Sequence, residues 1–218
     1  MIITIDGPAA AGKGTLAAVL AEKYHFAYFD TGMVYRAVGL EMRLQNLDCN
    51  NEKEAEKIAQ NLTFPHMMDL SRHPEFRSSE GGVAASIVSA HPKVRTALLG
   101  MQQNFAQNPV FADGSKAQGV VYDGRDTGTV VCPHADIKFF ITASAEVRAQ
   151  RRFEELKAKG NNTSYDTVLA DMIARDERDA KRATAPMKPA DDAIIFDTSC
   201  LSIQEVVHKV QEIIDNKR

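Results

Sequence analysis

The sequence predicts an α/β fold with a parallel sheet of about five strands and helices on both faces, arranged in three layers. Short apolar runs alternate with amphipathic stretches of helix length, and most of the runs lead into a turn and then a helix. Strands separated by helices imply right-handed crossovers and a parallel sheet. The length of 218 residues suits one large domain that buries roughly 70% of the unfolded surface.

The elements follow in chain order from the spacing of apolar residues. The expected strands are residues 2–5, 27–29, 120–122, 138–141 and 194–196. The expected helices are residues 13–23, 34–45, 146–158, 165–181 and 203–217. Irregular structure is expected at 63–82 and at 107–119, where the second stretch is polar enough for a mobile loop, and 157–164 is expected to be a tip between two helices.

Composition excludes several classes of protein. The formal net charge of −3 argues against a broad nucleic-acid footprint, and no apolar run reaches the length of a membrane span. The first residues lack the pattern of a secretion signal. Cys49, Cys132 and Cys200 lie far apart and form neither a CxxC pair nor a zinc spacing. We therefore expect a protein of the reducing cytosol, without a membrane or nucleic-acid partner.

A glycine-rich loop between the first strand and the first helix is the strongest signal in the chain. Its residues are Gly7, Pro8, Ala9, Ala10, Ala11, Gly12, Lys13, Gly14 and Thr15. Such a loop turns successive backbone N–H groups toward an anion at a helix N-terminus, so this is a phosphate loop (P-loop). Lys13 is expected to reach the outer phosphates, and Thr15 to serve Mg²⁺, directly or through water. The strict motif has Ser or Thr directly after the lysine, whereas this chain has Gly14.

A phosphate loop alone does not distinguish a kinase from a GTPase switch or an ATPase. A GTPase would carry an N-K-x-D tetrapeptide, which is absent from this sequence. Motor-type ATPases carry an acidic pair at a strand end, and here Asp123 and Asp126 are separated by Arg125. Besides the phosphate loop, the charged residues that could distinguish these classes are the arginines.

Arginines recur where ligands of an open α/β sheet are expected, at strand ends and on the helices that follow. They are Arg36, Arg125, Arg148, Arg151, Arg152, Arg175, Arg178 and Arg182. Phosphoryl transfer between nucleotides needs many fixed cations and no nucleophilic side chain, and arginine binds phosphate bidentately. The alternative is a set of solvated helix faces with pairs such as Arg175–Asp179, and the residues alone leave it open.

Five segments together resemble the bacterial cytidylate (CMP) kinase family. They are ITIDGPAAAGKGT at 3–15, FDTGMVYR at 29–36, HPKVR at 91–95, DGRDTGTVV at 123–131 and RDERDAKRATAP at 175–186. The resemblance covers roughly residues 2–60, 75–105 and 120–217. Many nucleotide kinases share the phosphate loop, whereas the fourth and fifth segments are much more specific.

The resemblance implies a single P-loop kinase domain over 1–218, with a nucleoside-monophosphate (NMP)-binding region at about 31–106 and a short lid at about 146–165. It implies an ATP- and Mg²⁺-dependent phosphotransferase of pyrimidine nucleotide metabolism that acts on CMP and dCMP as a cytoplasmic monomer. ATP would lie on residues 7–15. The implied catalytic residues are Lys13, Arg125, Arg152 and Arg182. Arg148, Arg151 and Lys159 would also fall in the lid segment.

The resemblance also implies the residues that bind the monophosphate. Thr31 and Arg36 would lie near its site, and Arg125, Arg178 and Arg182 would hold its phosphate. Arg175 and Asp179 would bind the ribose. Ser86, Arg95 and Asp126 would bind cytosine, and Asp126 suits that role because a carboxylate accepts from the 4-amino group and repels the carbonyl of uracil.

Two departures from the family pattern flank this site. Only about twenty residues separate Leu62 from Ala84, so the NMP-binding insert is expected to be shortened and to lack its usual small sheet. Residues 107–119 form a longer connection than usual. Two alternatives stay open: a kinase that acts on UMP or AMP, and a non-kinase P-loop regulator that binds nucleotide and signals through a partner.

Overall fold

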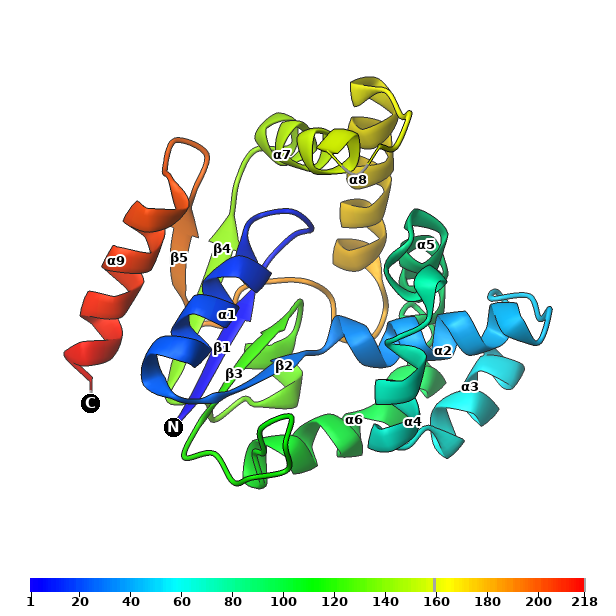
Figure 1. The fold of residues 1–218 in the computed structure, drawn as a ribbon, viewed down its shortest axis with the longest axis horizontal. Coiled ribbons are helices and arrows are strands. Elements are labelled where there is room, and N and C mark those ends of the chain that lie inside the picture. The colour runs from blue at the N-terminus through cyan, green and yellow to red at the C-terminus, as the bar shows by residue number, and fades with distance from the viewer. Residues whose placement is uncertain (159, 218) are drawn as a thin grey trace.

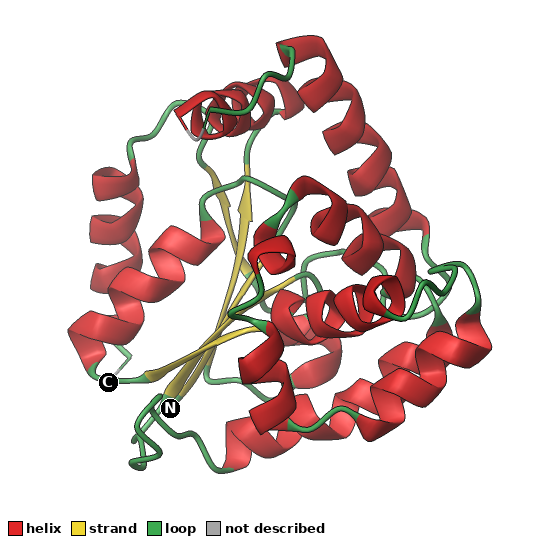
Figure 2. Ribbon diagram, turned by 45° about the vertical axis from the view of Figure 1, so that its right-hand side comes forward, coloured by secondary structure: helices red, strands yellow, loops and turns green. Residues whose placement is uncertain are grey.

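The computed structural model describes residues 1–158 and 160–217, so Lys159 and Arg218 lie outside the described residues. A parallel five-stranded sheet in the order β2-β3-β1-β4-β5 forms the middle layer (Figure 2). Its strands are β1 (Ile2–Asp6), β2 (Ala27–Asp30), β3 (Val120–Gly124), β4 (Ile137–Thr142) and β5 (Ile194–Asp197). All five predicted strands are confirmed. Each extends at its carboxyl end into polar residues that hydrophobicity alone does not mark, because ladder pairing continues there.

Helices cover both faces of the sheet. Helices α1 (Lys13–Tyr24) and α9 (Ile203–Asp215) pack on one face, where Leu16, Leu20 and Val210 join the buried cluster around Ile3 and Ile5 (Figure 1). Helices α2 (Gly32–Leu44) and α6 (Pro92–Gln107) belong to the cluster on the other face. The three-layer α/β prediction is therefore confirmed.

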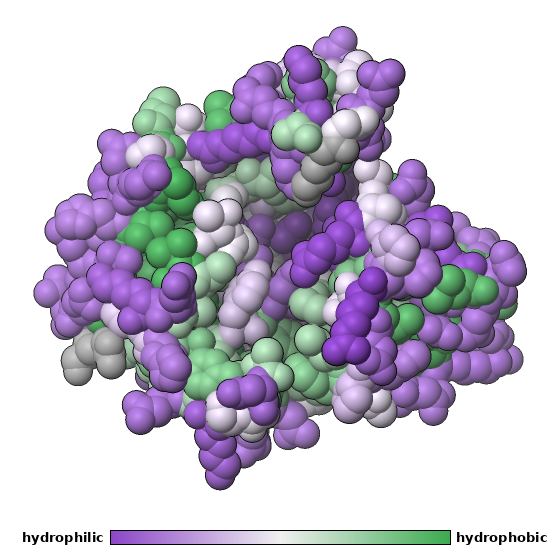
Figure 3. Space-filling model, viewed as in Figure 1, coloured by the Kyte–Doolittle hydropathy of each residue, from purple (hydrophilic) through white to green (hydrophobic). Residues whose placement is uncertain are grey.

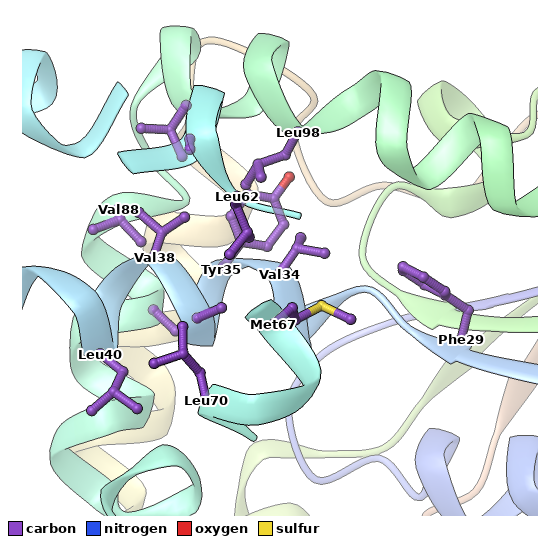
Figure 4. Packing of buried hydrophobic residues seen from close by; sticks show 14 of the residues in the cluster. Phe29, Val34, Tyr35, Val38, Leu40, Leu62, Met67, Leu70, Val88 and Leu98 are labelled. Carbon is purple, nitrogen blue, oxygen red and sulfur yellow. The ribbon is translucent and has the colours of Figure 1, made fainter. Parts of the chain in front are cut away.

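The region between β2 and β3 is helical wherever it is regular. It contains α3 (Glu52–Asn61), α4 (Phe64–Leu70), the 3₁₀ turn η1 (Pro74–Arg77) and α5 (Ser79–Val88). Their apolar side chains converge with those of α2 and α6 in one core (Figure 4). No strand occurs between residues 31 and 106, all of which are described. The shortened insert thus carries no sheet of its own.

The expectation of irregular structure over 63–82 is wrong. Pro65 and Pro74 lie in the first turns of α4 and η1, where a proline needs no hydrogen-bonded N–H. Thr63 caps α4 by accepting from His66 N, and Ser78 caps α5 by accepting from Gly81 N. These prolines predict an interruption of helical structure, but here they lie in the first turns of helical segments.

Two other segments expected to be irregular are confirmed as such. Residues 108–119 join α6 to β3 and contain a single isolated bridge, Val110–Lys116. The described residues between 158 and 165 separate α7 (Ala145–Ala158) from α8 (Tyr165–Lys181). These two helices pack on each other through Ala149, Val168 and Met172, and the P-loop residues Ala9 and Ala10 pack against that cluster.

The carboxyl ends of three strands meet next to the phosphate loop. In the sheet register, Asp6 of β1 lies beside Gly124 of β3, and Asp30 of β2 lies beside Asp123 of β3. A short π-helical turn, η2 (Thr127–Val131), follows β3 directly. Parallel pairing therefore brings together residues that are 93 and 118 positions apart in the chain.

Candidate active site

The phosphate loop depends on unusual backbone geometry. A Cβ on Gly7, whose φ is 141°, would lie 1.9 Å from the carbonyl oxygen of Ile141, so only glycine fits there. Ala10 and Gly12 also have positive φ values, of 57° and 92°. Alternation of this kind turns backbone N–H groups inward, and α1 begins directly afterwards at Lys13. The loop is thus shaped as an anion site at a helix N-terminus.

Lys13 and Asp123 form a buried pair beside this loop. Lys13 Nζ donates to the carbonyl oxygen of Pro8 at 2.8 Å and lies 3.8 Å from Asp123 Oδ1. Burial, with the nearby charge of Arg125, lowers the pKa of Lys13. Burial also raises the pKa of Asp123, although Lys13 opposes the shift. Burial therefore makes ionisation of both side chains less favourable, and the charge of bound phosphates would alter their pKa values.

Two cavities meet at this pair. One, of about 600 Å³, extends from the phosphate loop along α7 and the start of α9, and its size lies in the usual range of roughly 300–1,000 Å³ for a ligand pocket. The other, of about 100 Å³, lies between α2, α5 and α8. Lys13 and Asp123 are the residues that line both. Figure 3 shows a hollow lined by hydrophilic side chains in the middle of this face.

The larger cavity continues beyond the predicted loop residues. Arg151 on α7 donates to Thr198 at two atoms, Oγ1 at 3.2 Å and the carbonyl oxygen at 2.8 Å, and thereby joins the lid segment to the end of β5. Leu201 and Ile203 complete this end of the cavity. Residues 198–206 were not predicted as site residues, although their position after a parallel strand is a signal that could have found them.

The smaller cavity is lined by a chain of alternating charges. Asp126 binds Arg95 on one side and Arg182, at 3.3 Å, on the other. Asp179 lies 3.0 Å from Arg125 Nε and 3.9 Å from Arg182. Burial opposes ionisation of Asp179, yet Arg125 and the other guanidinium groups hold its pKa below the ordinary value. This row of paired side chains contains three arginines and two carboxylates, so its net charge is +1.

Most of the predicted monophosphate residues come together here. Eight of them line the smaller cavity: Thr31, Ser86, Arg95, Arg125, Asp126, Arg175, Asp179 and Arg182. The Arg175 guanidinium has a buried Nε without a hydrogen-bond partner among the described residues. Burial lowers its pKa, a shift that a bound anion would reverse. Tyr35 also lines this cavity, with Arg95 5.1 Å above its ring, and the sequence analysis had missed it.

Two predicted arginines do not line the cavity. Arg36 donates to the carbonyl oxygen of Phe76 at 2.8 Å, and Arg178 is exposed and donates to Ser86 Oγ at 3.2 Å. The helical pair considered as an alternative, Arg175 with Asp179, is also corrected. Asp179 is buried and bonds to Arg125 instead, because the turn after β3 offers a fixed guanidinium directly across the cavity.

The lid arginines divide into two groups. Arg148 is buried: it binds Asp176 at 2.7 Å and donates to the carbonyl oxygens of Ala143 and Ala9. It therefore joins α7 both to the phosphate loop and to α8. Arg152 lines the larger cavity and binds Glu155 at 2.7 Å. Lys159 lies outside the described residues.

In the strict motif the residue after the lysine carries the hydroxyl, whereas here the hydroxyl is on Thr15, one residue later. Thr15 is exposed and lines the larger cavity. Gly14, not Thr15, faces Asp123, because a Cβ at Gly14 would lie 3.2 Å from Asp123 Oδ2.

Asp6, which the sequence analysis had not selected, joins the end of β1 to the turn after β3. Its carboxylate accepts from Thr127 N and Oγ1, each at 2.8 Å, and from Gly128 N at 2.7 Å. Burial raises its pKa even though these donors favour the charged form. Since Asp6 immediately precedes Gly7, it ties the phosphate loop to the turn that carries Arg125 and Asp126.

Comparison with known proteins shows which family the chain resembles along its length. A sequence model described as cytidylate kinase matches residues 3–216. The chain is 50% identical over 217 residues to a cytidylate kinase of Paramagnetospirillum magneticum, covering 100% of this chain and 99% of that protein. It is 46% identical over 217 residues to the cytidylate kinase of Rhodospirillum rubrum, with coverage of 100% and 98%.

A solved structure shows the same fold at a greater distance. An uncharacterized protein from Eubacterium ventriosum superposes with a TM-score of 0.53 at 14% identity, over 99% of this chain and 98% of that one. At that identity the likeness concerns the fold alone. Because the family model and the relatives both match essentially the whole chain, this protein belongs to the cytidylate kinase family.

Proposed function

We propose that this protein transfers the terminal phosphoryl group of ATP to CMP, giving ADP and CDP. The observation that carries the proposal is the meeting of two cavities at Lys13 and Asp123. One cavity contains the phosphate loop and the other contains the arginine–carboxylate chain. Two phosphorylated ligands bound in them would have their phosphates face each other at that pair.

The donor nucleotide would occupy the larger cavity. The N–H groups of the phosphate loop and Lys13 would bind its phosphates, and the surface formed by Arg151, Thr198 and Leu201 would hold its base end. Arg152, on the same side of the cavity, is placed to neutralise charge on the transferred group. Closure of the lid over it would exclude the water that hydrolyses ATP.

The chain also fits a nucleotide-bound Mg²⁺. Among the described residues there is no group of three acidic, His or Cys side chains that could hold a metal by itself. One carboxylate, Asp123, lies at the junction of the cavities, and the Thr15 hydroxyl lines the donor cavity. This donor set suits Mg²⁺, which usually takes one or two protein oxygens and the oxygens of the substrate phosphates. The ion would neutralise charge on those phosphates.

The transfer needs no covalent intermediate with the protein. An oxygen of the acceptor phosphate forms a bond to the γ-phosphorus while the bond from phosphorus to the ADP oxygen breaks. Lys13, Arg125 and Arg182 surround the point where charge is redistributed, and Arg152 approaches from the lid. Catalysis then consists of positioning and of electrostatic stabilisation.

Specificity for cytosine is proposed to reside in Ser86, Arg95 and Asp126. The three residues line one cavity, and the Asp126 carboxylate can accept from the 4-amino group of cytosine. Arg175 and Asp179 would bind the ribose, whose 2′-hydroxyl is absent from dCMP, and we propose dCMP as a second acceptor. Arg36 and Arg178 would have to leave Phe76 and Ser86 to reach the acceptor phosphate.

The acceptor cavity must enlarge before CMP can bind. Its volume of about 100 Å³ is below the usual range for a ligand pocket. Arg125 and Arg182 are engaged by carboxylates, so the acceptor phosphate would replace Asp179 as their partner. We propose that the NMP-binding region at 31–106 moves outward to admit CMP and that the lid segment at 146–165 closes on ATP.

The experiment is steady-state formation of ADP from Mg·ATP with CMP, dCMP, UMP or AMP, beside a control without acceptor. Fast turnover with CMP and dCMP alone is expected. Faster turnover with UMP or AMP would leave a kinase but overturn the cytosine pocket. ATP binding without stimulation by any monophosphate would favour a nucleotide-binding regulator.

Further expectations concern the molecule's setting. No helix in the described part of the chain is long and apolar enough to cross a membrane. We propose that the protein acts as a monomer in the cytoplasm, in pyrimidine nucleotide metabolism. The net charge of −3 supports small nucleotides, and not nucleic acid, as its ligands.

A further inference from the structure

Position 14 of the phosphate loop lacks a hydroxyl that the strict motif contains. The strict motif uses Ser or Thr directly after the lysine to bind Mg²⁺, whereas Gly14 has no side chain. A Cβ built on Gly14 would lie 3.2 Å from Asp123 Oδ2 and 3.6 Å from Tyr28 Oη. A serine at this position would therefore lie next to both the Asp123 carboxylate and the Tyr28 hydroxyl, which are themselves 3.4 Å apart.

Tyr28 reaches this space from the strand β2, at the edge of the sheet. It lies two residues before Asp30, the partner of Asp123 in the sheet register, and the residue is 41% exposed. Its hydroxyl donates to Asp123 Oδ2 at 3.4 Å. Burial around the hydroxyl and the charges of Asp123 and Asp30 raise the pKa of Tyr28, so that it remains a donor at neutral pH.

We propose that Tyr28 is a positioning residue: it orients Asp123 next to the Mg²⁺-bound phosphates of the donor nucleotide. Its hydroxyl lies, from a neighbouring strand, close to the place where the strict loop carries the hydroxyl of residue 14. It acts through Asp123, which lines both cavities, by holding Oδ2 in place while Oδ1 faces Lys13. The inference rests on the proposed function, because it assumes that a Mg²⁺-bound nucleotide occupies the larger cavity.

The separation of 3.4 Å is long for a hydrogen bond between oxygens. Hydrogen bonds of an active site are often long without substrate and shorten in the complex. The Tyr28 contact should therefore matter chiefly when metal is bound. Without the hydroxyl, Asp123 loses a donor that restricts its orientation, and the affinity gained from Mg²⁺ should fall about fivefold, as for one hydrogen bond of typical net strength.

The test is calorimetric titration of ADP into wild type and Tyr28→Phe, with and without Mg²⁺. The gain in ADP affinity on adding Mg²⁺ should fall about fivefold in Tyr28→Phe. Affinity for ADP without Mg²⁺, and KM for CMP, should remain as in wild type. Tyr24→Phe is the matched control, since the Tyr24 hydroxyl bonds to Asp215 at 2.8 Å, between α1 and α9.

A second variant tests the replacement directly. Gly14→Ser added to Tyr28→Phe places a hydroxyl beside Asp123 from the loop, and it should recover most of the Mg²⁺-dependent gain. An undiminished gain in Tyr28→Phe would overturn the proposal. An equal loss of ADP affinity with and without Mg²⁺ would also overturn it, because it would show a structural role. A wild type that binds no ADP would instead refute the proposed function.

Discussion

Burial shifts the pKa values of Lys13 and Asp123 toward each other. Asp123 is raised to about 6, first because it is buried, and Lys13 is lowered to about 8, first for the same reason. Catalysis as proposed needs the ionised carboxylate and the protonated amine. The ratio kcat/KM, which reports groups of the free enzyme, should therefore fall below about pH 6, as Asp123 gains a proton, and above about pH 8, as Lys13 loses one.

The pH–rate profiles of wild type and Lys13→Arg test this assignment. Arginine keeps its charge to high pH, so the variant should be slower but should lose the alkaline limb. The same substrates serve both proteins, so their own ionisation cancels in the comparison. An alkaline limb that persists unchanged in Lys13→Arg would show that another group titrates there.

Asp126 is a residue whose chemistry the sequence indicates and whose partners only the structure shows. Asp126→Asn should reduce the ratio of kcat/KM for CMP to that for UMP by tenfold or more, on the order of 1–3 kcal/mol. The physical reason is that an amide can donate to the carbonyl of uracil, whereas a carboxylate repels it.

Two observations check that result. The exposed Asp69, which pairs with Arg72 on the surface, offers the control Asp69→Asn, which should leave the ratio unchanged. Because Asp126 also pairs with Arg95 and Arg182, the melting temperature of Asp126→Asn should be measured in parallel. A wild-type ratio in a folded Asp126→Asn variant would remove Asp126 from the cytosine pocket.

At the scale of elements, the contact between α2 and α5 positions the acceptor cavity. A Cβ at Gly39 would lie 2.9 Å from backbone atoms of both Ala84 and Ala85, so the two helices approach closely there. Tyr35 on α2 and Ser86 on α5 line the cavity on either side of this contact. The spacing of the two helices therefore sets where these side chains lie.

Gly39→Ala should push α5 away from α2. We expect a loss of about 1–3 kcal/mol in the free energy of unfolding, or a few degrees in melting temperature per kcal/mol. KM for CMP should rise while KM for ATP stays near wild type. The matched control is Gly100→Ala on α6, where a Cβ would meet no atom within 4 Å and helix propensity should add stability. Equal changes in both KM values would contradict a local effect.

At the scale of the whole molecule, two separate cavities share the single pair Lys13 and Asp123. An adenosine joined to a cytidine through a chain of phosphates should occupy both at once. Its affinity should exceed that of ADP or CMP by about 10²-fold or more, because the second end binds intramolecularly. Calorimetry with the diadenosine analogue as control measures this gain. An affinity no better than that of the tighter nucleotide would mean that the cavities cannot be bridged.

The fold class, all five strands and the phosphate loop can be predicted from local patterns in the sequence: apolar runs, helical spacing and a glycine-rich turn between a strand and a helix. The family resemblance then placed residues such as Arg95 and Asp179, which local patterns alone left ambiguous. The helical segments that carry Pro65 and Pro74 in their first turns were missed, because a proline indicates a break and a first turn equally well.

Only the tertiary structure decided how the charged side chains pair. Asp179 turns to Arg125, 54 residues away in the chain, and Asp6 accepts from Thr127, 121 residues away. An arginine is long and has several staggered conformations, so its partner depends on what folding brings within reach: Arg125 binds a carboxylate of α8, whereas Arg152 binds one on its own helix. For the same reason Tyr28 beside Asp123 could not be read from the chain: it depends on the register of β2 against β3.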